Sequence, residues 1–358
     1  MPSLKEIKGR INSISSTLAI TSAMKMVASA KLQKAQMAIQ NMLPYERRLY
    51  SMLIDLMGAM NISAAASEDG SVRGSGSAER GFDQSGDRLS LSNRHDLAGM
   101  DGAYSLMAQR EVRKVAIVAF ASNSSLCGAF NSNAIREATA VINEYRASGL
   151  RDSDIVVYSV GRKMAEAMRK LGFPSPADFT KMSDSPSYEA ASALAQELFD
   201  GFVSGRFDKV ELVYNHYKST SSQPTTRQTY LPLSLADATA DLQAGKITDS
   251  ASETDTNRVA EPVGAPVVRQ GSPTTEDLIV EPSKEALIAT LLPKVVRLRI
   301  FTTLLDSAAA EHAARTVAMQ LATDNGNDLL QELTLEYNKG RQQKITSEIL
   351  DLVGGSLQ

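Results

Sequence analysis

The chain has 358 residues, enough for two structural modules, and a slightly negative net charge, with 38 Lys and Arg against 41 Asp and Glu. This balance excludes a general affinity for nucleic acid, and apolar runs such as 115–120 are far shorter than the roughly 20 residues that span a bilayer. Membrane association is therefore expected only through protein partners, and the single cysteine, Cys127, excludes an intrachain disulfide.

Residues 1–60 predict a long amphipathic helix. Apolar side chains recur three or four positions apart at Leu4, Ile7, Ile11, Ile14 and Leu18. A serine at position 3 followed by a glutamate at position 6 is typical of a capping box at the start of a helix. Pro44 is expected either to kink this helix or to end it, and residues 45–60 can resume it.

Two polar segments, 61–110 and 236–275, interrupt the chain. Both are rich in Gly, Ser, Thr, Asp and Arg and contain few side chains that could be buried. Such segments cannot offset the entropy lost on ordering, so we expect flexible inserts. A tolerated surface insertion is one interpretation of each, and a regulatory or partner-binding device is the other.

Between these inserts, residues 111–235 alternate strand and helix patterns. Strands are expected at 112–120, 154–160, 209–217 and 228–233, and helices at 131–148, 161–171 and 188–203. Residues 276–283 are expected to return to the same sheet as a further strand. This order predicts a doubly wound, Rossmann-like α/β module, with a parallel sheet covered by helices on both faces.

The α/β module offers no convincing active site. The turn at 121–131 follows a strand, where doubly wound folds bind phosphates, but it lacks both GxGxxG and a GKS or GKT sequence. Cys127 is expected to be a packed, inert thiol, and the three histidines are too scattered for a metal site. We therefore predict no catalytic residue, no metal and no cofactor.

Residues 284–358 predict a second long helix, clearest from position 294 onward. An approximate three-four spacing, typical of a coiled-coil seam, relates Leu291, Val295, Leu298, Leu305, Ala309, His312, Met319, Leu330 and Leu333. Alanines at 308–310, 313, 314 and 318 would let a second helix approach closely. We expect the two ends of the chain to pair as an antiparallel two-helix coiled coil; a long helix buried in a bundle is the alternative.

Three stretches resemble one known family. Residues 4–36, 124–131 (SSLCGAFN) and 311–355 are similar to the terminal helices and a central turn of the gamma subunit of F-type ATP synthases. The resemblance implies a central rotor shaft, not itself catalytic, that transmits torque between an ion-driven membrane ring of c subunits and the catalytic beta subunits. The implied partners are three alpha and three beta subunits, the epsilon subunit and the c ring.

The resemblance also implies which residues contact these partners. Those matched to contacts with the beta subunit are Met24, Lys25, Lys31, Lys34, Arg315, Arg341, Gln342 and Thr346. Glu281, with Leu278 before it, is matched to the contact of the foot, the α/β module, with the c ring and the epsilon subunit.

The implied location is peripheral, at the cytoplasmic face of a bacterial inner membrane. The N-terminus has neither the apolar region of a secretory signal nor an Arg- and Ser-rich leader. From the residues alone, two other classes of function remain open. One is a coiled-coil tether or adaptor that displays an α/β binding module, and the other is a nucleotide-dependent enzyme with a helical arm.

Overall fold

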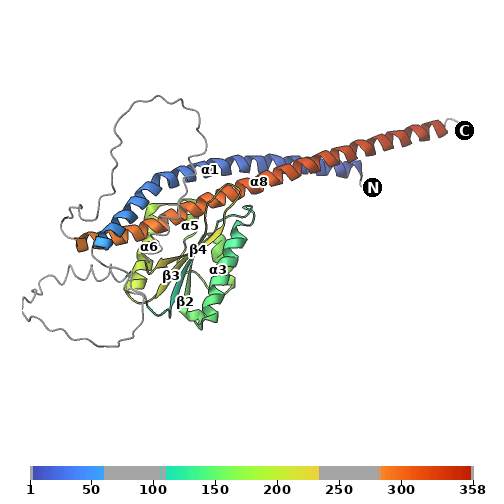
Figure 1. Cartoon of the computed structure of the whole chain (residues 1–358). Helices are drawn as coiled ribbons and strands as arrows, with labels where there is room; N and C mark the ends of the chain where they lie inside the picture. Colours follow the sequence, from blue (N-terminus) through green and yellow to red (C-terminus); the bar gives the residue numbers. More distant parts are fainter. Residues whose placement is uncertain (1–2, 60–105, 107–109, 234–280, 282–283, 356–358) are drawn as a thin grey trace, which may run out of the picture.

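The structure of the chain is a computed structural model, which describes residues 3–59, 106, 110–233, 281 and 284–355. Two long helices lie side by side and carry an α/β module on one side of the pair (Figure 1). The segments predicted at 61–110, 236–275 and 276–283 lie almost entirely outside the described residues.

The two long helices are α1 (Leu4–Ala59) and α8 (Lys284–Gly355). Their 56 and 72 residues correspond to about 84 and 108 Å of helix at 1.5 Å per residue. Pro44 lies inside α1, so the helix does not end there, and Pro293 lies inside α8, which begins well before position 294. Burial of Leu49 and Leu53 beyond Pro44 stabilises the continued helix against the loss of one backbone hydrogen bond.

The contacts between α1 and α8 run in opposite directions along the two helices. Leu4 packs against Gly340, Leu18 packs against Gly326, and the hydroxyl oxygens of Thr21 and Thr323 are 3.2 Å apart. From position 319 toward the C-terminus of α8, the less exposed positions follow a three-four spacing: Met319, Thr323, Gly326, Leu330, Leu333, Tyr337 and Gly340. The two ends of the chain therefore lie together as an antiparallel helix pair.

The sheet has four strands in the order β2-β1-β3-β4. They are β1 (Val115–Phe120), β2 (Ile155–Val160), β3 (Lys209–Asn215) and β4 (Thr225–Leu231). β1 is parallel to β2 and β3, but β4 is antiparallel to β3, so the prediction of a wholly parallel sheet is wrong. The cause is the short connection at 216–224, because a parallel return needs a crossover of a dozen or more residues.

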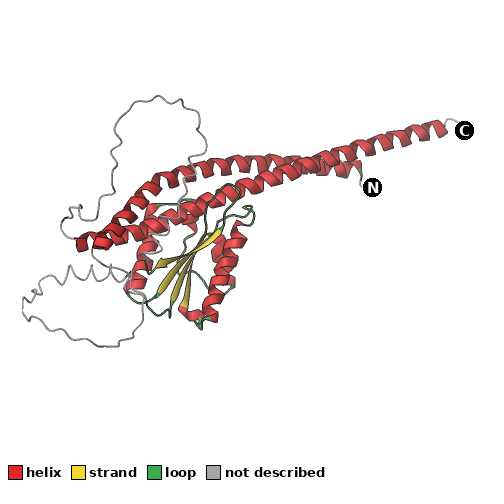
Figure 2. Ribbon diagram, viewed as in Figure 1, coloured by secondary structure: helices red, strands yellow, loops and turns green. Residues whose placement is uncertain are grey.

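Helices cover both faces of this mixed sheet (Figure 2). α3 (Phe130–Ala147) and α4 (Arg162–Lys170) pack on one face, in a buried cluster that includes Ile117, Ile142 and Met164. α6 (Tyr188–Val203) and the long helices cover the other face, in a cluster that includes Leu198 and Leu292. The short α5 (Thr180–Asp184) and a 3₁₀ turn (Asp152–Asp154) complete the module. The end of the helix pair that contains Leu53 of α1 and Leu292 of α8 thus forms one of the layers that enclose the core of the module.

Candidate functional site

The upper part of the helix pair projects beyond the α/β module, and the C-terminal end of α8 extends past the N-terminus of α1 (Figure 1). Large apolar side chains are exposed along it: Ile20, Met26, Val27, Leu321, Leu329, Leu335, Ile345, Ile349, Leu350, Leu352 and Val353. Exposed apolar surface on this scale is typical of a region that binds other proteins. In the described part of the chain, no helix is both long and apolar enough to cross a membrane.

The residues predicted to bind partners are divided between this projecting surface and the level at which the helix pair contacts the α/β module. Lys31, Lys34, Arg341, Gln342 and Thr346 are exposed, whereas Met24 and Lys25 are half-buried. Glu281 is exposed just before α8, and Leu278 lies outside the described residues. Six of the residues predicted to contact partners are thus exposed in this chain.

Arg315 lies in a different environment. Its guanidinium donates to the Glu311 carboxylate over 2.6 Å and to the Ser125 carbonyl over 3.4 Å, and its side chain is 12% exposed. It therefore connects α8 to the turn after β1. The prediction that Arg315 contacts a beta subunit stays a prediction.

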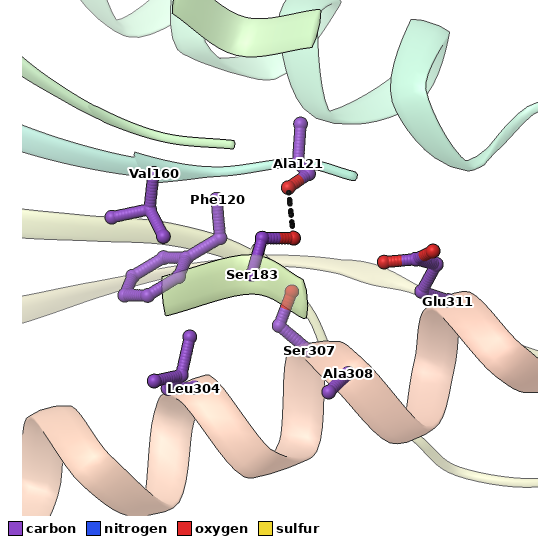
Figure 3. Close-up of a pocket in the computed structure, with 8 residues that line it drawn as sticks. All are labelled: Phe120, Ala121, Val160, Ser183, Leu304, Ser307, Ala308 and Glu311. Carbon is purple, nitrogen blue, oxygen red and sulfur yellow. Dashed lines mark hydrogen bonds between the residues drawn. The ribbon is translucent and has the colours of Figure 1, made fainter. Parts of the chain in front are cut away.

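A small cavity separates α8 from the end of the sheet beside this ion pair (Figure 3). Its volume is about 10 Å³, and its lining includes Ser183, Ser307, Ala308 and Glu311. The Ser183 hydroxyl donates to the Ala121 carbonyl over 3.0 Å across one side of it. Ligand pockets measure about 300 Å³ or more, so this cavity is a packing gap and not a binding site.

The histidine beside the ion pair is held uncharged. Burial, together with the nearby positive charges of Lys31 and Arg315, lowers the pKa of His312 to about 4. Burial also raises the pKa of the neighbouring Glu311, although Arg315 opposes this effect. Both shifts favour the neutral form of the side chain, as expected where α8 is covered by the module.

The His312 shift predicts a loss of stability in mild acid. Because the imidazole binds a proton more readily in the unfolded chain, stability present above pH 6.5 is lost as the pH falls toward 4. The free energy of unfolding is expected to fall by at most about 1.4 kcal/mol per pH unit, and solvent screening of this half-buried group reduces that slope. His312→Gln is expected to flatten this decline, measured by urea unfolding at several pH values. An unchanged slope would contradict the assignment, since Glu311, of opposite sign, remains in both proteins.

The turn at 121–131 is packed against α8. Cys127 is 1% exposed, and the Asn131 side-chain amide donates to its sulfur over 3.1 Å. Leu126 has a φ of 68°, and Gly128, with a φ of 59°, faces Ala318 of α8. A buried thiol is the environment predicted for Cys127. Among the described His, Cys, Asp and Glu residues, no group of three is placed to hold a metal ion.

Sequence reasoning missed the polar contacts that join the α/β module to both long helices. Asp306 of α8 binds the end of β3, with its Oδ2 atom 2.6 Å from His216 Nδ1, and Gln36 of α1 donates to the Tyr217 hydroxyl over 2.6 Å. One signal was available, because Asp306 is a charged residue inside an apolar stretch of α8.

Comparison with known proteins identifies the family. The sequence matches the ATP synthase family over residues 3–357. It is 47% identical to the ATP synthase gamma chain of Phocaeicola vulgatus, over 100% of both chains. This chain belongs to the ATP synthase gamma chain family. Within it, the gamma chain of Bacteroides thetaiotaomicron is 44% identical over 100% of both chains, and that of Flavobacterium johnsoniae is 35% identical over 99% of this chain and 98% of that one.

The family relationship extends over the polar segments, because relatives from Phocaeicola and Bacteroides match along their whole length. Their chains are therefore about as long as this one, and the overall length is a shared property. A solved structure, titled as the OSCP/F1/c-ring part of the Euglena gracilis mitochondrial ATP synthase, contains a chain of similar fold. That likeness has a TM-score of 0.51 at 18% identity and covers 98% of this chain and 92% of that chain.

Proposed function

We propose that this chain is the central rotor shaft of an F-type ATP synthase, transmitting torque between an ion-driven c ring and the catalytic beta subunits. The observation that carries the proposal is the antiparallel helix pair that projects from the α/β module in a member of the gamma chain family. A helix of about 108 Å cannot be enclosed by one small module, and its exposed apolar end fits a bearing formed by surrounding subunits.

We further propose that the helix pair is a coiled coil. The support is the three-four spacing of its less exposed positions and the close approach at Gly326 and Gly340, where leucines of α1 fill the space next to each glycine. Continuous side-chain interlocking would make the pair stiffer than a single helix. Stiffness is the physical property that a shaft requires.

The proposed partners are the alpha, beta, epsilon and c subunits, with membrane contact only through them. The upper helix pair would bind beta subunits through Met24, Lys25, Lys31, Lys34, Arg315, Arg341, Gln342 and Thr346. Glu281 and Leu278 would lie at the foot, next to the c ring and the epsilon subunit. The domain division proposed is 1–60 and 284–358 for the shaft, 111–235 with 276–283 for the foot, and 61–110 and 236–275 for inserts.

The chain itself is proposed to catalyse no reaction. ATP synthesis or hydrolysis would take place on the beta subunits, and the complex would sit at the cytoplasmic face of a bacterial inner membrane. Support comes from the buried, enclosed environment of Cys127 and from the switch point between β1 and β3, where ligands bind in doubly wound folds. In this chain, Cys127 and Phe130 pack against Ala310 of α8, and this contact covers the switch point.

The experiment that tests the function is assembly with partners in a membrane vesicle. With this chain, a complex of the alpha, beta, epsilon and c subunits from the same organism is expected to pump ions when it hydrolyses ATP; without it, hydrolysis would drive no pumping. A complex that pumps equally well without the chain would reject the rotor function. Association without any effect on pumping would indicate a tether, and ATP binding by the isolated chain would indicate an enzyme.

The proposed beta contact near the C-terminus predicts a loss of turnover. Arg341 and Gln342 are exposed, so replacing both by alanine is expected to leave folding unchanged. Losing two hydrogen bonds to a partner, one of them charged, is expected to lower ATP hydrolysis by the assembled complex about tenfold or more. Glu336→Gln, also exposed on the projecting part of α8, is the control. Full turnover in the double variant would remove these two residues from the contact.

A further inference from the structure

The α8 helix presents small side chains where it passes the residues that follow β1 and β3. Ala309, Ala310 and Ala313 are fully buried there, and Ala314 is half-buried. Because these side chains are short, larger groups from neighbouring elements can approach the helix backbone closely. The groups that fill this space come from both α1 and the α/β module.

The connection between β3 and β4, at 216–224, binds α8 through its first two residues. His216 Nδ1 lies 2.6 Å from Asp306 Oδ2, and the backbone N–H of Tyr217 donates to Asp306 Oδ1 over 2.9 Å. The Asp306 side chain is only 17% exposed, so water competes little for these contacts. One carboxylate therefore fixes the backbone of this connection on α8.

The side chain of Tyr217 reaches the other long helix. The Gln36 amide of α1 donates to the Tyr217 hydroxyl over 2.6 Å. The ring packs in one cluster with Leu32 of α1 and Ala309 of α8, and in a second cluster with the turn after β1. A single tyrosine of the β3–β4 connection thus touches both helices of the pair and the turn after β1.

We propose that Tyr217 is a positioning residue that clamps α1 onto α8 where the helix pair leaves the α/β module. Asp306 holds the Tyr217 backbone, and the Tyr217 side chain holds α1 at Gln36. Above this level, from Met319 to Gly340, α8 pairs with α1 along the seam. The position of α1 at the clamp therefore sets where the projecting part of the pair begins.

The importance of this clamp for rotation rests on the function proposed above. Only a shaft that turns needs α1 and α8 to be kept from sliding past each other next to the α/β module. The clamp is a property of the chain alone. It can be tested without partner subunits, so that its failure and the failure of the rotor function give different results. If Tyr217 is a clamp, replacing it is expected to raise amide hydrogen exchange locally in α1. If it only stabilises the fold, replacing it is expected to raise exchange equally along the whole chain.

The test is amide hydrogen exchange of the full chain. Tyr217→Phe keeps the ring and removes the hydroxyl that binds Gln36, and it is expected to raise exchange in residues 32–39 about fivefold, the effect of one ordinary hydrogen bond. Tyr217→Ala, which also removes the ring, is expected to raise it tenfold or more. Asp306→Asn is expected to act on the same segment, because it weakens the contact with His216.

The matched control is Tyr188→Phe, which alters a hydroxyl at the exposed start of α6, where Tyr188 packs edge-on against Phe301 of α8. It is expected to leave exchange in residues 32–39 unchanged. The proposal would be overturned if neither Tyr217 variant changed exchange in residues 32–39. An equal increase along the whole chain would overturn it as well, because that result means only a loss of global stability.

Discussion

Replacing Gly161 by alanine is expected to lower the free energy of unfolding by about 4 kcal/mol. Gly161 follows β2 with a φ of 98°, a conformation that strains any residue with a Cβ atom. An added Cβ would lie 2.0 Å from the Ala121 carbonyl oxygen and 2.8 Å from its carbon. Both are backbone atoms of the residue after β1, and the oxygen also accepts the Ser183 hydroxyl, so this backbone cannot shift without losing contacts.

The control for Gly161→Ala is Gly205→Ala. Gly205 has a φ of 73°, but no atom lies within 4 Å of the position its Cβ would take. This variant therefore measures backbone strain alone, about 1–2 kcal/mol. Chemical denaturation of both variants separates strain from collision. Equal losses in the two variants would show that the C-terminal end of β1 moves freely, against the packing described for this turn.

Replacing Glu211 by glutamine is expected to lower the free energy of unfolding by about 3 kcal/mol or more, because it leaves cations without their buried partner. Glu211, in the middle of β3, is 1% exposed. Its carboxylate accepts the Tyr145 hydroxyl over 2.6 Å and Arg227 Nε over 2.7 Å, and Lys209 Nζ is 2.7 Å away. In either orientation, an amide in this position would turn its NH2 group toward at least one of the two cations.

Glu144→Gln is the matched control, since Glu144 pairs with the same Arg227 from an exposed position. Its loss is expected to stay below about 1 kcal/mol, the usual value of a surface ion pair. A loss as large as that of Glu211→Gln would mean that the exposed pair, and not the buried carboxylate, stabilises this side of the sheet.

The buried carboxylate also predicts acid sensitivity. Burial alone would raise the pKa of Glu211, but hydrogen bonds from Arg227, Lys209 and Tyr145 hold it below its ordinary value of 4.5. The folded chain therefore binds this proton less readily than the unfolded chain. The stability it contributes is present above pH 4.5 and is lost as the pH falls through the lowered pKa. Glu211→Gln is expected to lose this part of the acid dependence in the same denaturation measurements.

Much of the architecture follows from local sequence patterns. The spacing of Leu4, Ile7 and Ile11 predicts the buried face of α1, and the apolar run at 115–120 predicts a fully buried strand. Hydrophobic periodicity is a property of neighbouring residues, so it can be recognised without knowing the fold. Arg341, Gln342 and Thr346 were selected instead through the resemblance to the family, and all three lie on an exposed helix surface.

What the sequence determined by itself is the set of elements: two long helices with matching seams, an alternating α/β module and polar segments between them. Only the tertiary structure decided how these elements meet. It made β4 antiparallel, turned Arg315 toward Glu311 and Ser125, and joined Tyr217 to Gln36 and Asp306. These contacts link residues up to 190 positions apart, and local spacing carries no information about which distant side chain completes each one.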